Sequence, residues 1–136
     1  MNYVEWTLDL EEEIDPRDPL GTIKIMGDEG YIEDKCTYLN NYFEAILLGI
    51  QSMKKGQIVS IDPIIEPDCI EFDYTNDFLL LSYAKQQTKV INVEKFISDV
   101  QQSICDLLDV LDAAPVREGK TRPNFEILRK FVRNNL

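Results

Sequence analysis

Carboxylates are the only side chains in this sequence that are dense enough to suggest chemistry. The stretch 11–18 holds five acidic residues, and the stretch 62–68 holds three. Carboxylate oxygens are ligands for Mg²⁺ and Ca²⁺, and two carboxyl groups can act together as an acid and a base. Neither stretch has the spacing of a calcium-binding EF-hand loop. A solvated acidic loop is therefore the simpler interpretation of both.

The other motifs that carry catalysis or ligand binding are missing. The sequence contains no histidine, which excludes a Ser-His-Asp or Cys-His relay and a zinc site with histidine ligands. It has no glycine-rich phosphate loop, dinucleotide fingerprint or nucleophile elbow. Cys36, Cys69 and Cys105 are odd in number and widely spaced, which is typical of reduced thiols. We therefore expect no enzyme activity, no cofactor and no metal.

Alternating apolar residues predict strands through much of the chain. Val4, Trp6 and Leu8 point to one side of the first strand, with Glu5 and Thr7 on the other. The turns between successive strands are short, so the sheet should be mostly antiparallel. Further strands are predicted at 23–25, 57–61, 70–74, 78–83 and 89–93, with 31–32 as part of another.

Apolar residues at helical spacing predict helices over 37–55 and 93–113. Gly49 weakens the first of these slightly. Pro123 suits the first turn of a short final helix. The expected fold is α+β, in a single domain covering residues 1–136: five to six mostly antiparallel strands, two longer helices on one face and a short C-terminal helix.

The charge is strongly negative and unevenly distributed. The 136 residues include 25 acidic and 14 basic side chains, for a net charge of −11. Residues 1–112 carry −15 and residues 113–136 carry +4. Nucleic acid and anionic membranes are disfavoured as partners, because their phosphates repel such a chain. The N-terminus has no signal-peptide pattern, and no apolar run approaches the length of a membrane span, so we expect a cytoplasmic protein.

Two interpretations of this charge remain open. The basic tail can dock on its own acidic body, or the acidic body can meet a basic protein. If Ile70 and Phe72 face the core, then Glu71 and Asp73 face outward. We name the favoured contact surface the strand–loop cluster: Asp62, Glu66, Asp68, Glu71, Asp73 and Asp77. We name the rival surface, on the helix predicted at 93–113, the helix ridge: Asp99, Asp106 and Asp109.

A small acidic α+β domain without catalytic motifs, with segments 41–50 (NYFEAILLGI) and 73–78 (DYTNDF), resembles the immunity proteins of bacterial toxin systems. These include the systems of contact-dependent growth inhibition. The resemblance implies a cytoplasmic antidote that binds one cognate toxin domain one to one, often a nuclease, and blocks its active site. The alternatives are a small carboxylate-based enzyme or metal-binding domain, and a regulatory or scaffold domain.

Overall fold

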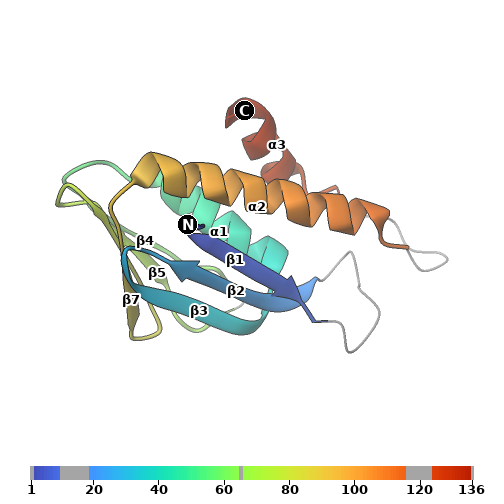
Figure 1. Cartoon of the computed structure of the whole chain (residues 1–136), viewed down its shortest axis with the longest axis horizontal. Helices are drawn as coiled ribbons and strands as arrows, with labels where there is room; N and C mark the ends of the chain where they lie inside the picture. Colours follow the sequence, from blue (N-terminus) through green and yellow to red (C-terminus); the bar gives the residue numbers. More distant parts are fainter. Residues whose placement is uncertain (1, 10–18, 65, 116–123, 136) are drawn as a thin grey trace.

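The computed structural model describes residues 2–9, 19–64, 66–115 and 124–135, and its fold is α+β as expected (Figure 1). One antiparallel sheet of seven strands packs against helices. The strands are β1 (Val4–Leu8), β2 (Leu20–Met26), β3 (Glu29–Tyr38), β4 (Ile58–Ile61), β5 (Ile70–Asp73), β6 (Leu79–Tyr83) and β7 (Gln86–Val90). The helices are α1 (Leu39–Ser52), α2 (Val93–Ala113) and α3 (Glu126–Asn135).

The sheet consists of two meanders joined side by side. Its strand order is β1-β2-β3-β7-β6-β5-β4, with β1 and β4 at the two edges. Helix α1 connects the meanders in sequence, and the pairing of β3 with β7 joins them in space. The segment that follows β4 therefore lies at an edge of the sheet, where a partner can reach it.

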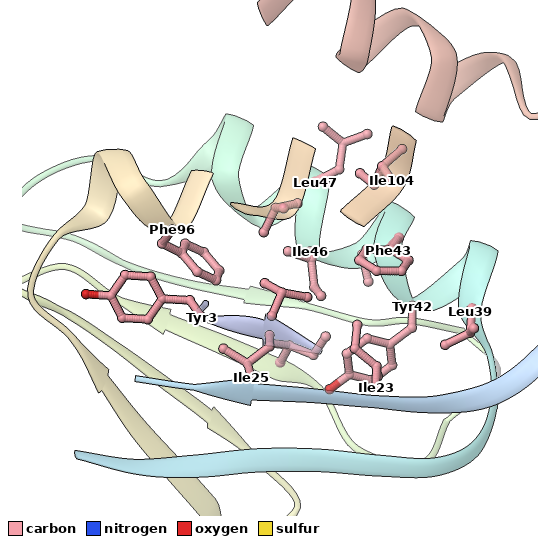
Figure 2. Packing of buried hydrophobic residues seen from close by; sticks show 14 of the residues in the cluster. Tyr3, Ile23, Ile25, Leu39, Tyr42, Phe43, Ile46, Leu47, Phe96 and Ile104 are labelled. Atoms are coloured by element: carbon pink, nitrogen blue, oxygen red, sulfur yellow. The ribbon is translucent and has the colours of Figure 1, made fainter. Parts of the chain in front are cut away.

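Helices α1 and α2 cover one face of the sheet (Figure 1). Inward side chains of the strands meet the apolar stripes of both helices, as Ile25, Phe43 and Phe96 illustrate in Figure 2. These three side chains are at most 1% exposed. The expected arrangement of two longer helices on one face is confirmed.

Gly49 in α1 has a packing role that explains why a poor helix former occupies the helix interior. Phe72 of β5 is fully buried beneath it. A methyl group at position 49 would overlap the Phe72 ring. The missing side chain therefore lets α1 lie close to the sheet.

The expected count of five to six strands is too low, because the described residues form seven. Strand β3 is ten residues long and includes the polar run Glu33–Lys35, which hides its alternation in the sequence. Its pairing with β2 also shifts register between Gly21 and Ile23, and Cys36 adopts a left-handed φ of 57°. A bulge of this kind interrupts the period of two that identifies a strand.

The boundaries of β7 also differ from the prediction, which placed this strand at 89–93. The turn is formed by Ala84 and Lys85, both with positive φ, and β7 begins at Gln86. Thr88 is polar yet 1% exposed, because its hydroxyl donates to the carbonyl oxygen of Gly30 at 2.9 Å. Tertiary hydrogen bonding thus allows a polar residue on the buried face.

The predicted helices agree with the structure more closely than the predicted strands do. Helix α2 has the predicted bounds, and α1 lies within the range predicted for it. Helix α3 is present, although Pro123 lies outside the described residues. Across the part of the chain that the structure describes, no helix has the length and apolar character needed to cross a membrane.

The basic tail docks on the body through α3. Leu128 and Phe131 are buried against α1 and α2, and Arg129 forms an ion pair with Asp112 of α2. The contact is therefore largely apolar, with electrostatic support. Lys130 and Arg133 remain exposed. Three further basic residues of the tail, Arg117, Lys120 and Arg122, lie outside the described residues.

Candidate functional site

The loop between β4 and β5 carries three acids of the strand–loop cluster, and they do not all face solvent. Asp62 is exposed and accepts a hydrogen bond from the backbone N–H of Ile64 at 2.8 Å. Asp68 is also exposed. Glu66 is only half-buried, and its Oε1 accepts a hydrogen bond from the Thr37 hydroxyl at 2.7 Å. Glu66 thus ties the loop to the end of β3.

The two acids on β5 differ in their surroundings. Ile70 and Phe72 are fully buried and Glu71 is exposed, which confirms the predicted alternation. Glu71 pairs with Ser60 on β4 and Ser82 on β6. Asp73 is half-buried, and its Oδ1 accepts hydrogen bonds from the backbone and hydroxyl of Thr75, at 3.0 and 2.5 Å. Asp73 therefore stabilises a turn.

The sixth acid of the cluster lies at the other end of β5. Asp77 is in the turn between β5 and β6, and its carboxylate pairs with Lys55 Nζ at 3.1 Å. The hydrogen bond and the charge of Asp77 raise the pKa of Lys55. The antiparallel pairing of β4 with β5 places Asp62 and Asp68 at one end and Asp73 and Asp77 at the other. The structure thus divides the strand–loop cluster into two groups.

A hollow of about 410 Å³ lies where the β4–β5 loop meets the β6–β7 hairpin. We name it the acidic hollow. Asp68 and Glu71 supply its carboxylates, and Tyr83 and Gln86 also line it. Lys85 is a basic residue in the lining. The hollow is open to solvent, and its polar lining suits a charged group of a partner.

A further acid, which the sequence analysis missed, is hydrogen-bonded to Tyr83. Asp34 on β3 accepts a hydrogen bond at its Oδ2 from the Tyr83 hydroxyl at 3.0 Å. The Glu66 carboxyl group is near enough for its charge to act on Asp34. Burial raises the pKa of Asp34, and the negative charge of Glu66 raises it further, while the Tyr83 hydrogen bond opposes both. We name Asp34 and Glu66 the carboxyl pair.

No signal in the sequence could have identified this pair. Asp34 lies within the polar run that obscures β3, and Glu66 was assigned to an outward-facing group. The two residues are far apart in the chain, and only the pairing of Asp34 with Ile23, on the side covered by helices, turns Asp34 inward.

Tyr42 of α1 completes the surroundings of the carboxyl pair. Its ring meets the Tyr83 ring edge to face, with 5.5 Å between ring centroids. The side chain is 1% exposed, and its hydroxyl has no hydrogen-bond partner among the described residues. Burial, and then the charges of Tyr83, Asp34 and Glu66, raise the pKa of Tyr42. The Tyr42 hydroxyl is therefore close to these acids and unpaired.

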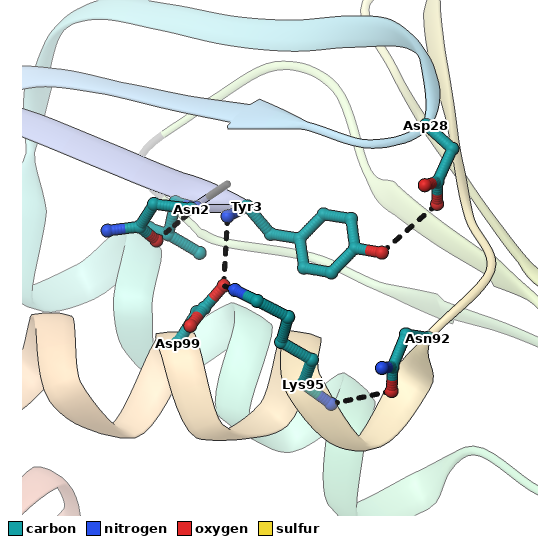
Figure 3. A network of polar contacts seen from close by, with 7 residues as sticks. Asn2, Tyr3, Asp28, Asn92, Lys95 and Asp99 are labelled. Atoms are coloured by element: carbon teal, nitrogen blue, oxygen red, sulfur yellow. Dashed lines mark hydrogen bonds and ion pairs between the residues drawn. The ribbon is translucent and has the colours of Figure 1, made fainter.

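The helix ridge is used within the molecule itself. Asp99 Oδ2 accepts hydrogen bonds from the backbone N–H of Tyr3 at 2.9 Å and from Lys95 Nζ at 2.7 Å (Figure 3). Asp106 is exposed and accepts a hydrogen bond from the Gln102 side chain at 2.9 Å. Asp109, the third residue of the ridge, is also exposed and lines a groove between α2 and α3.

Figure 3 shows how the N-terminal strand is held against α2. The Tyr3 hydroxyl donates to Asp28 at 3.1 Å, and the Asn92 side chain caps α2 by accepting from the Lys95 backbone N–H at 3.1 Å. Asp99 therefore belongs to a network that joins β1, the β2–β3 turn and the start of α2.

Metal binding has little support in the geometry. Within the described ranges, no three Cys, Asp or Glu side chains gather closely enough to hold a metal ion.

Comparisons with family models, with curated proteins and with solved structures gave no match. The site must therefore be interpreted from its own chemistry.

Proposed function

We propose that this protein is an immunity protein that binds a basic toxin domain and blocks it by charge-complementary occlusion. The observation that carries the proposal is the concentration of carboxylates where the β4–β5 loop meets the sheet edge. Asp68 and Glu71 are exposed there, and the carboxyl pair lies behind them. No ion pair between described residues reaches these four acids.

Like charges crowded at one edge repel one another, and a cationic partner relieves that repulsion. A cluster of one sign also accelerates the encounter with an oppositely charged protein. A domain that cleaves nucleic acid needs a basic cleft for phosphate groups. An acidic surface can occupy such a cleft in place of the substrate, and a nuclease is therefore the activity we expect for the toxin domain.

Apolar side chains near these acids favour a protein partner. Ile58 on the edge strand β4 is 56% exposed, and Ile64 in the following loop is 87% exposed. Protein interfaces bury apolar anchors within a polar rim. The same edge thus offers both charge for steering and apolar area for affinity.

A second function, a small carboxylate-based enzyme, is favoured by one observation. The carboxyl pair contains an acid with a raised pKa, and such groups occur at sites of acid–base catalysis. The absence of histidine leaves these carboxyls without the usual partner for proton transfer. We therefore place this function after the immunity function.

The test begins with a neighbouring gene for a large secreted protein whose C-terminal domain is basic. We expect that purified domain to form a one-to-one complex with this protein, measured by size-exclusion chromatography and calorimetry. Binding should weaken as salt rises, since exposed charges are screened. Cells that express the domain should survive when they also make this protein. Failure to bind, or binding that is insensitive to salt, would contradict the proposal.

A further inference from the structure

The carboxyl pair has a hydrogen-bonding arrangement that leaves room for one more donor group. Tyr83 donates to Asp34 at 3.0 Å, and Thr37 donates to Glu66 at 2.7 Å. Each carboxylate has a second oxygen, and the charge of Glu66 acts on Asp34. A cation near both carboxylates would offset the repulsion between their negative charges.

The Tyr42 hydroxyl is a second and independent sign that a further group can bond here. It is almost completely buried and close to the pair, yet it lacks a hydrogen-bond partner among the described residues. Buried hydroxyls are nearly always paired, because leaving one unpaired costs about 1–3 kcal/mol. The described residues therefore leave this hydroxyl able to bond a further group beside the two acids.

The pair can be reached from solvent. Asp34 and Glu66 are both only half-buried. A side chain of a partner can therefore approach both carboxyl groups from solvent.

We propose that the carboxyl pair forms the seat for one arginine side chain of the basic partner. This inference rests on the proposed function, since it names the group by which the toxin domain would be held. A guanidinium is planar, carries five donors and accepts none, so it can donate to both carboxylates at once. It also brings a positive charge that offsets the repulsion between the two carboxylates.

Other cations fit the seat less well. A lysine ammonium is a compact point charge, and it lacks the planar fork that matches two carboxylates. A divalent metal ion prefers more charged ligands than this pair supplies, and the described residues bring no third acid close enough. The geometry thus distinguishes arginine from lysine and from magnesium.

The test uses the full chain and three probes: the blocked tripeptide Gly-Arg-Gly, its lysine counterpart Gly-Lys-Gly, and MgCl₂. Each is titrated into the ¹⁵N-labelled protein, and amide shifts are followed by NMR. We expect the arginine peptide to shift signals around Asp34, Glu66 and Tyr83, with about fivefold tighter binding than the lysine peptide. Equal binding of both peptides, or the same shifts with magnesium alone, would overturn the proposal.

Variants locate the seat. Asp34→Asn and Glu66→Gln should each weaken binding of the arginine peptide about tenfold, since each removes one of two charged acceptors. The matched control is Asp106→Asn, which removes one carboxylate from the helix ridge and should leave binding unchanged. An equal loss of peptide binding in the control would mean that net charge alone causes the effect, and it would overturn the assignment.

Tyr42→Phe removes only the hydroxyl and keeps the ring packed. It should leave the protein folded and weaken peptide binding about threefold, because one uncharged hydrogen bond is lost. Unchanged peptide binding in a folded Tyr42→Phe variant would show that this hydroxyl does not serve the seat.

The inference and the proposed function can fail separately. If the toxin domain binds wild type and Glu66→Gln equally well, the immunity function stands and the arginine seat is wrong. If the arginine peptide binds at the pair but no basic toxin domain forms a complex, the seat stands and the immunity function fails.

Discussion

The helix ridge and the strand–loop cluster have similar acidic composition but different surroundings. In the ridge, Asp99 accepts from a backbone amide and from Lys95, and Asp106 accepts from a neighbouring glutamine. At the loop end of the cluster, Asp68 and Glu71 line an open hollow next to a half-buried pair of acids.

This difference shows that a count of acids does not identify a binding surface. A carboxylate that already holds a donor inside its own fold has less to gain from a partner. A carboxylate crowded by like charges gains when a cation arrives. We therefore propose the loop end of the cluster, rather than the ridge, as the contact surface.

The largest expected effect is on binding of the toxin domain. Reversing two charges of the hollow with Asp68→Lys plus Glu71→Lys should weaken affinity at least 100-fold, about 3 kcal/mol, because it places like charges against a basic partner. The matched control, Asp106→Lys plus Asp109→Lys, makes the same change in net charge on the ridge. We expect the control to change affinity less than about threefold, as measured by calorimetry. Equal losses of affinity in the two double variants would show that the two surfaces contribute alike to binding.

The next effect is on stability, and it concerns the ridge. Asp99→Ala should lower the free energy of unfolding by about 2 kcal/mol, because the Asp99 side chain is 17% exposed and bonds two donors. Urea unfolding measures this change. Asp109→Ala, an exposed site on the same helix, should stay within about 0.5 kcal/mol of wild type. If Asp109→Ala costs as much as Asp99→Ala, the network around Tyr3 is not what stabilises this region.

A smaller effect depends on pH and concerns the carboxyl pair. The pKa of Asp34 in the folded protein is raised above its unfolded value, mainly by burial. Its stabilising contribution is thus complete below the unfolded pKa and is lost as pH rises through the folded pKa. Asp34→Asn mimics the protonated acid, so it should gain stability relative to wild type between about pH 4 and about pH 7. Urea unfolding of the variant and of wild type at both pH values tests this. The same difference in unfolding free energy at both pH values would contradict a raised pKa of Asp34.

The smallest effect is expected at Asp77, which the sequence placed in the binding surface. Its pair with Lys55 is exposed, with side-chain exposures of 96% for Asp77 and 65% for Lys55. Exposed pairs contribute little to stability. Asp77→Asn should leave the unfolding midpoint unchanged and weaken the toxin complex less than about threefold. A large loss of affinity would move the interface toward the β5–β6 turn.

Much of the fold could be predicted because local pattern and packing agree. The apolar stripe of α2 and the alternation of β5 survive unchanged in the structure. Strand β3 could not be predicted in full, because its bulge and its polar run interrupt the alternation of apolar and polar residues. The start of β7 was misplaced because Thr88 is paired by backbone carbonyls of another strand.

The site was predicted only in part. The outward position of Glu71 follows from alternation, and the structure confirms it. The inward position of Glu66 does not follow from any local pattern, because a loop residue has no period. The direction of the Glu66 side chain depends on Thr37 and Asp34, which the fold brings close to it.

By itself the sequence determined the acidity, the α+β class and the alternation that puts Glu71 outside, since these depend on composition and on neighbours in the chain. Only the tertiary structure decided which acids already hold partners, and that Asp34 and Glu66 meet beside an unpaired Tyr42 hydroxyl. The physical reason is that electrostatic energy depends on distance and burial, and residues 34 and 66 acquire both only when β3 and the β4–β5 loop pack together.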